Sequence, residues 1–203
     1  MAAIIPVSFV GSDVGTYRVL RMETVVGAPL APVTAVTSHA QHVALDGVPV
    51  SAWVLRGTST HVRYVEQSEQ NTLRAVQPAL GRQDCSHAAL IPIRKSDAWW
   101  DLPQDERRAI FEARSQHIAA TLKYLPAIAR RLHHSRELGE PFDFLTWFEY
   151  APEHAGLFEE LVQLLRRTEE WKYVEREVDI RLISSPGSER PAPVGPCSVR
   201  PAE

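Results

Sequence analysis

Residues 114–134, RSQHIAATLKYLPAIARRLHH, change from a helical pattern to a strand pattern at Pro126. Upstream of the proline, apolar residues recur at helical spacing and Pro103 stands where the first turn would be, so a helix beginning near residue 103 is predicted. Proline removes a backbone donor and cannot continue a helix, so the helix should stop or kink there. The residues that follow, AIARRLHHS at 127–135, are typical of a strand.

The turn at Pro126 decides whether two polar side chains can share a site. In one unbroken helix, the 13-residue separation of His117 and Arg130 would place them roughly 20 Å apart along the axis. A strand that folds back against the helix removes this distance. On that strand Arg130, Leu132 and His134 point one way and Arg131 and His133 the other, so only one arginine of the pair can face the interior.

The rest of the chain divides into two related halves. After the strand at 127–135, RELGEP at 136–141 suits a hairpin connection to a second strand, FDFLTWFEY at 142–150. An amphipathic helix at 151–170 and a closing strand at 171–182 complete this half. The first half repeats the order more faintly, with a strand pair at 51–57 and 59–66, a helix at 68–80 and a strand at 86–93.

Strand, strand, helix and strand in each half predict an α+β fold of duplicated ferredoxin-like units. These units are expected to form a dimeric α/β-barrel with a trimmed N-terminal half. The leading helix of the first copy is missing or shrunken, and the prolines of GAPLAPVTAV at 27–36 favour a loop or edge segment there. The predicted division is a reduced N-terminal half at 1–95, a C-terminal half at 96–184 and a flexible tail at 185–203, which is rich in Pro, Ser and Gly.

Composition excludes several classes of function. With 22 basic against 25 acidic residues in 203 and no block of like charges, the chain lacks the charge pattern of nucleic-acid or membrane-surface binding. Cys85 and Cys197 lie far apart, and no HExxH or C-x-x-C motif indicates zinc. The N-terminus lacks a basic segment ahead of its apolar run, and no apolar run is long enough to span a membrane, so the cytoplasm is the expected location.

A lone histidine on an apolar helix face, such as His117, is more often a hydrogen-bonded core residue than a ligand. A wider set of motifs favours a functional role for His117. These are IPIRKSDAWW at 91–100, the spacing of Glu106, Arg107 and His117 on the helix, RRLHHSRELGEPFDFLTWFEY at 130–150, and LLRRTEEWKYV at 164–174. Together they resemble the chlorite dismutase family of haem proteins, and most closely its short, dimeric branch with a trimmed N-terminal half. The resemblance is dense from Ala89 to Leu182, and LRGTSTHVRYVE at 55–66 extends it upstream.

The resemblance implies a role for nine residues. His117 matches the proximal ligand of the iron of haem b, Arg130 the catalytic distal arginine, and Glu170 the carboxylate that accepts a hydrogen bond from the ligand imidazole. Contacts with the haem and its propionates fall to Lys95, Trp99 and Trp100, and the distal pocket wall to Leu132, Thr146 and Phe148. Strand alternation independently places Arg130 with Leu132 on one face, and Thr146 with Phe148 on another.

The activity implied by the resemblance is conversion of chlorite, a small anionic substrate, to chloride and dioxygen by a homodimer. A ferryl intermediate and transient hypochlorite are implied on the path, with Arg130 detaining the hypochlorite until recombination. The related haem-biosynthesis decarboxylases carry a tyrosine before the proline where this chain has Ile91, and a glutamine where it has Arg130, so a decarboxylase is disfavoured. A haem peroxidase-like or nitric-oxide-related enzyme and a non-catalytic haem-binding dimer remain the alternatives.

Overall fold

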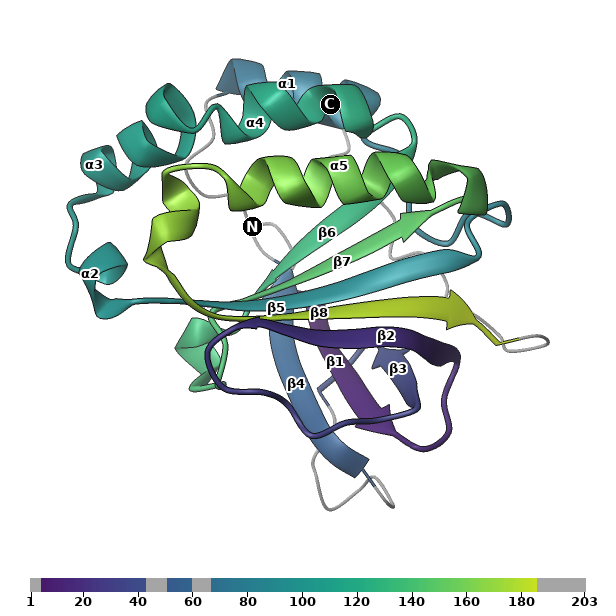
Figure 1. The fold of residues 1–203 in the computed structure, drawn as a ribbon. Helices are drawn as coiled ribbons and strands as arrows, with labels where there is room; N and C mark the ends of the chain where they lie inside the picture. Colours follow the sequence, from purple (N-terminus) through teal and green to yellow (C-terminus); the bar gives the residue numbers. More distant parts are fainter. Residues whose placement is uncertain (1–4, 43–50, 60–66, 186–203) are drawn as a thin grey trace, which may run out of the picture.

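Eight antiparallel strands close into a barrel in the order β1-β3-β2-β8-β5-β7-β6-β4 (Figure 1). The structure is a computed structural model, and it describes residues 5–42, 51–59 and 67–185. The strands are β1 (Ile5–Ser12), β2 (Tyr17–Val26), β3 (Ala35–His39), β4 (Ser51–Ser59), β5 (His87–Lys95), β6 (Ile128–His134), β7 (Phe144–Tyr150) and β8 (Val174–Ser184). A mixed α and β chain with an antiparallel sheet is therefore confirmed.

Helices gather over the outer face of the strands from the second half of the chain, with α1, α4 and α5 side by side above β6, β7 and β5 (Figure 1). The α-helices are α1 (Gln67–Val76), α2 (Asp97–Trp100), α3 (Gln104–Arg108), α4 (His117–Thr121) and α5 (Ala155–Arg166). The described residues also form a π-helical turn, η2 (Ala109–Arg114), between α3 and α4. Their 3-10 turns are η3 (Leu122–Tyr124), η4 (Arg136–Leu138), which lies between β6 and β7, η5 (Pro152–His154) and η6 (Glu170–Tyr173). No helix in the described parts of the chain is long and apolar enough to cross a membrane.

Aromatic side chains fill the inside of the barrel. Trp147 of β7 stacks on Phe9 of β1 with ring centroids 5.4 Å apart, and Tyr17 of β2 meets it edge-on at 5.0 Å. These contacts join strands from both halves of the chain, so one interior core holds the halves together.

A second core lies between the sheet and α5. The helix carries apolar residues at Phe158, Leu161, Val162 and Leu165, the spacing of one helical face, and all four are buried. They pack on the outward-facing side chains of β5 and β7, among them Phe148, whose ring lies 5.0 Å from Phe158. Burial of this face fixes α5 across the strands.

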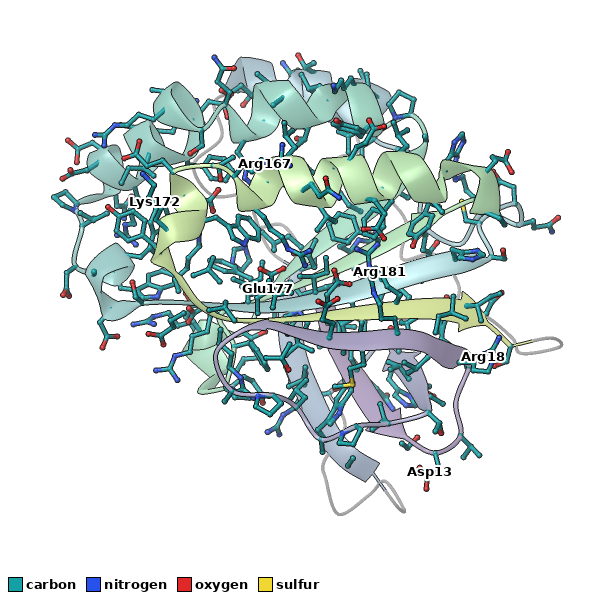
Figure 2. All side chains as sticks on the ribbon, viewed as in Figure 1. Asp13, Arg18, Arg167, Lys172, Glu177 and Arg181 are labelled. Carbon is teal, nitrogen blue, oxygen red and sulfur yellow. The ribbon has the colours of Figure 1, made fainter. Side chains whose placement is uncertain are left out.

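Charged residues on β8 face α5, while the residues between them face the barrel core. Glu177 and Asp179 are fully buried, and Arg166 of α5 reaches both, at 2.6 and 2.8 Å. Arg181 pairs with Asp179 and with Glu159 of α5. Figure 2 shows Glu177 and Arg181 between β8 and α5. Burial alone would raise the pKa of Asp179, but the hydrogen bonds and charges of Arg181 and Arg166 outweigh it and lower that pKa. A one-residue slip of β8 would expose these charges to the barrel core, so the network fixes the register of β8.

The turn predicted at Pro126 is confirmed, since β6 begins at Ile128, and so is the hairpin that follows it. Strands β6 and β7 pair antiparallel with Arg130 opposite Phe148 and Leu132 opposite Thr146. The connection contains Gly139 in the left-handed region, at φ 70°.

Three expectations for the elements need correction. The helix expected from residue 103 is interrupted at Ser115 and Gln116, where Gln116 adopts a positive φ of 50°. The closing strand begins at residue 174 and not at 171, because 170–173 form the turn η6. Strand β4 continues through residue 58 to 59 and pairs with β1 and β6, so the break expected in the pair 51–57 and 59–66 is absent; residues 60–66 lie outside the described part.

Candidate functional site

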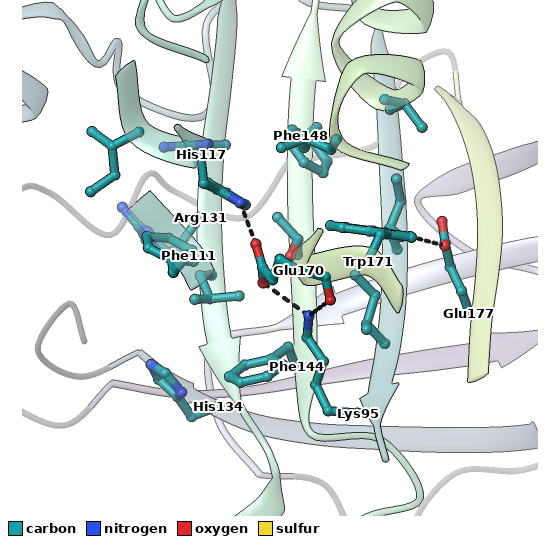
Figure 3. Close-up of a pocket in the computed structure, with 18 of the residues that line it drawn as sticks. Lys95, Phe111, His117, Arg131, His134, Phe144, Phe148, Glu170, Trp171 and Glu177 are labelled. Atoms are coloured by element: carbon teal, nitrogen blue, oxygen red, sulfur yellow. Dashed lines mark hydrogen bonds and ion pairs between the residues drawn. The ribbon is translucent and has the colours of Figure 1, made fainter. Parts of the chain in front are cut away.

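A cavity of about 310 Å³ lies between the outer face of β5, β6 and β7 and the helices α1, α4 and α5 (Figure 3). Its walls are mainly apolar, with Ile91, Ile93, Phe111, Ile118, Leu132, Phe144, Phe148, Val162, Leu165 and Trp171 among them. Ionisable groups also stand in these walls, namely His117, Lys95, Arg130, Glu170, Arg131, His134 and Glu177. This volume and this mixture are typical of small-molecule and cofactor sites.

The imidazole of His117 is oriented by a carboxylate. His117 is the first residue of α4, and its Nδ1 lies 2.8 Å from Oε2 of Glu170 in η6 (Figure 3). Its ring stacks on Phe111 of η2, with ring centroids 4.4 Å apart and 22° between the planes. Because an ionised carboxylate only accepts, the hydrogen bond places a proton on Nδ1, so that in the neutral form of the imidazole Nε2 is the nitrogen with the lone pair.

Lys95 keeps that carboxylate ionised. Its Nζ donates to Oε1 of Glu170 at 2.9 Å and to the Glu170 carbonyl oxygen at 3.1 Å, and the two residues are only 3 % and 6 % exposed. Burial alone would raise the pKa of Glu170, but the charges of His117 and Lys95 and their hydrogen bonds lower it to about 2. Burial lowers the pKa of Lys95, and the attraction of Glu170 opposes this shift. The carboxylate therefore stays negative at neutral pH.

Arg130 brings a positive charge to the same cavity from β6. Its guanidinium makes only a long contact with Thr121 Oγ1, at 3.5 Å, and no carboxylate of the described residues forms an ion pair with it. Burial lowers the pKa of Arg130 to about 10, so the side chain still carries its charge at neutral pH. A partly buried cation that forms no ion pair within the described chain is an attractive position for a small anion.

The remaining predicted site residues fall into two groups. Trp99, Leu132, Thr146 and Phe148 line the cavity, and Leu132 is 40 % exposed. Trp100 is not among the lining residues, since its indole stacks on Phe144 and donates to Asp143 Oδ2 at 3.3 Å.

Lys95 lines the cavity, but its ammonium is bonded to Glu170 and also lies over the ring of Trp99, 4.7 Å from its centroid. It is thus part of the support of His117, and its predicted propionate contact stays a prediction.

Several lining residues were missed from the sequence. Ile91, Ile93 and Phe144 could have been found, because each stands two residues from another lining position on its own strand. Phe111 and Trp171 had no such signal, since they reach the cavity from the π-helical turn and the 3-10 turn that replace the expected regular elements.

Comparison with known proteins assigns the fold and site to a family. The family model for chlorite dismutase matches residues 22–184, so the chain belongs to the chlorite dismutase family. Among solved structures, the dimeric chlorite dismutase of Nitrobacter winogradskyi is similar, with a TM-score of 0.82 and 56 % identity over 88 % of this chain and 99 % of that one.

More distant relatives agree on the fold. A chlorite dismutase from Candidatus Nitrospira defluvii, solved with imidazole, superposes with a TM-score of 0.64 at 21 % identity, over 91 % of this chain and 92 % of that one. A curated chlorite dismutase of Ideonella dechloratans is 35 % identical over 86 residues, which are 42 % of this chain and 28 % of that relative. This chain thus spans little more than a quarter of the curated relative that it matches.

Proposed function

We propose that the chain binds haem b in this cavity and converts chlorite to chloride and dioxygen. The observation that carries the proposal is the convergence of a carboxylate-bonded imidazole from α4 and an arginine without an acidic partner, among the described residues, from β6. Family membership and the 56 % identity to a protein named as a dimeric chlorite dismutase support the same activity.

The residues around the cavity fit a haem. A macrocycle with a broad apolar surface requires apolar and aromatic walls, which Phe144, Phe148 and Trp171 provide. An iron with one protein ligand requires an imidazole nitrogen with a lone pair, and the bond of His117 to Glu170 makes Nε2 that nitrogen in the neutral imidazole. We assign His117 as the proximal ligand, with Trp99 among the haem contacts.

Bound haem would supply the redox chemistry that breaks a chlorine–oxygen bond of chlorite and forms the oxygen–oxygen bond of dioxygen, with chloride as the other product. The protein sets the electronics of this reaction from the proximal side. Glu170 holds the Nδ1 proton of His117 and makes the ligand nitrogen more electron-rich. Lys95 keeps Glu170 negative, so the imidazole retains its acceptor at working pH.

Arg130 attracts the substrate anion and retains the anion formed from it. Its charge attracts chlorite into an apolar cavity, where an electrostatic attraction is stronger than in water. Hypochlorite is also an anion, and the same charge detains it until it recombines. Leu132, Thr146 and Phe148 form the wall around this cation and limit the access of water. Escaped hypochlorite would oxidise the haem, so Arg130 also protects the enzyme.

We also propose the quaternary and domain organisation. A homodimer is expected, because the relative from Nitrobacter winogradskyi is named as dimeric. The strand order contains two runs of four strands, β8-β5-β7-β6 and β4-β1-β3-β2. When the strands of each run are numbered in chain order, both runs have the order 4-1-3-2. This shared order supports duplicated ferredoxin-like units. In this scheme β5 groups with the second unit, so we place the boundary before residue 87 and not after 95. The flexible tail at 185–203 and a cytoplasmic location remain predictions.

The proposal is tested by oxygen release. Purified protein is titrated with haem until its Soret absorbance saturates, and chlorite is then added in an oxygen electrode. We expect one dioxygen for each chlorite consumed, and a much slower reaction with hydrogen peroxide and an electron donor. Saturable haem binding without oxygen release would refute the activity, and the absence of haem binding would refute the cofactor as well.

A further inference from the structure

Helix α4, which presents His117, starts at an interruption that its own sequence does not explain. Neither glycine nor proline stands at residues 115–116, yet Gln116 adopts φ 50° and ψ 36°, a left-handed conformation that is rare for a residue with a side chain. The Gln116 side chain makes no capping hydrogen bond to the helix. Something outside the usual capping position must therefore stabilise the first turn of α4.

Glu112 supplies the missing cap from the preceding π-helical turn. Its Oε2 accepts a hydrogen bond from the backbone N–H of Ile118 at 2.7 Å, and its Oε1 accepts one from Ala119 at 3.2 Å. These are the second and third N–H groups of α4, the donors that a capping side chain normally satisfies. The backbone oxygen of Glu112 also accepts from Gln116 N–H at 2.8 Å, which closes the segment 112–119 on itself.

The segment that interrupts the helix also contacts η6, which carries Glu170, the partner of His117. Ser115 Oγ accepts from the backbone N–H of Glu170 at 3.1 Å, and Arg114 pairs with Glu169 at 3.0 Å. Residues 112–115 thus hold both partners of the bond between His117 and Glu170. They hold His117 through the backbone of α4 and Glu170 through the backbone of η6.

We propose that Glu112 is a positioning residue for His117. It holds the first turn of α4 in the register that directs the imidazole to Glu170 and to the cavity. The inference rests on the proposed function in one respect, that His117 is the ligand of the haem iron.

The geometry explains why the cap controls direction. Without the carboxylate, the N–H groups of Ile118 and Ala119 lose their acceptors, and Gln116 is free to return to the helical conformation that the sequence itself favours. Rejoining α4 to the preceding turn shifts the helical register, and each residue of shift rotates a side chain by about 100° around the axis. The His117 ring would then leave both Glu170 and the cavity.

The test compares Glu112→Ala and Glu112→Gln with Glu160→Gln, which changes an exposed carboxylate of α5. In haem-free protein, amide exchange at residues 118 and 119 and the NMR signal of the His117 Nδ1 proton report the cap and the imidazole bond. In haem-loaded protein, haem dissociation and the resonance Raman frequency of the iron–imidazole stretch report the ligand.

For Glu112→Ala we expect faster amide exchange, loss of the Nδ1 proton signal, a changed stretching frequency and haem dissociation about tenfold faster, the effect of a bond or two lost. The amide oxygen of Glu112→Gln can accept one of the two bonds and should give an intermediate result, while Glu160→Gln should match the parent.

Two outcomes would overturn the inference. Unchanged amide exchange in Glu112→Ala would show that no cap exists. Faster exchange with parental Nδ1 signal and stretching frequency would reduce Glu112 to a stabiliser of α4. If the parent binds no haem, the proposed cofactor fails, and the haem-free measurements still decide whether Glu112 positions His117.

Discussion

Replacement of Glu170 by glutamine tests the electrostatics of the proximal side most directly. The change keeps the shape of the side chain and removes a charge that two buried groups share, Lys95 Nζ at 2.9 Å and His117 Nδ1 at 2.8 Å. The two donors contact different oxygens of the carboxylate, and glutamine keeps an oxygen at only one of these two positions and places an NH2 group at the other. Lys95, 3 % exposed, would keep its charge in an apolar environment without a counter-ion, which is strongly destabilising.

The magnitude follows from the pKa of Glu170. Folding lowers this pKa from 4.5 to about 2, and each unit corresponds to ~1.4 kcal/mol, so the carboxylate contributes about 3 kcal/mol to the free energy of unfolding. The folded pKa is the lower of the two, so the contribution is complete above about pH 5 and is lost as the pH falls towards 2. Glu170→Gln should therefore lower stability by about 3 kcal/mol at pH 7.

Urea unfolding of haem-free parent and variant between pH 7 and pH 3 measures this difference. The gap between the two proteins should shrink on acidification, because below about pH 5 the unfolded parent takes up a proton at Glu170 that the folded parent does not bind, which favours unfolding of the parent alone. Glu160→Gln, on the exposed face of α5, should unfold like the parent throughout. A gap that is absent at pH 7, or that stays constant down to pH 3, would refute the coupling of Glu170 to Lys95 and His117.

Substitutions at three further positions probe the ligand, the cation and the core. His117→Ala should retain the fold by circular dichroism but lose tight haem binding, and an unaltered Soret band would contradict the ligand assignment. Arg130→Ala should bind haem like the parent yet complete fewer chlorite turnovers before inactivation, with Arg130→Lys between the two; equal survival of all three would rule out the proposed role. Phe158→Ala removes a fully buried ring between Phe148 and Tyr150 and should lower the free energy of unfolding by about 3–5 kcal/mol, as measured by urea unfolding, whereas a loss below about 1 kcal/mol would mean that this core is loosely packed.

The second half of the chain was predictable from its patterns. FDFLTWFEY at 142–150 faces two different environments, the barrel core and the cavity, and the hairpin turn before it carries its own signals. The first half gave weaker signals for physical reasons. Strand β1 is buried on both faces and so shows no alternation, whereas β2 buries only Tyr17 completely. Neither pattern separates a strand from a loop or a short helix.

For the site, the family motifs and strand alternation led to His117, Arg130 and Glu170, all of which line one cavity. The predictions for Trp100 and Lys95 depended on local geometry that no pattern shows. Neighbours on a helical turn point about 100° apart, so Trp99 can face the cavity while Trp100 cannot. Lys95 stands at a shift of register in β5, and such irregularities re-aim a side chain. In its case the side chain reaches Glu170.

The two faces of the sheet serve different purposes, and this has a consequence for how the chain can vary. The cavity lies on the outer face, whereas the inside of the barrel is filled by its own aromatic core. Adjacent residues of β7 serve the two sides, since Trp147 packs inside the barrel while Thr146 and Phe148 line the cavity. Exchanges among the inward-facing residues can therefore accumulate without touching the cavity walls, and the two sides of one sheet are free to evolve separately.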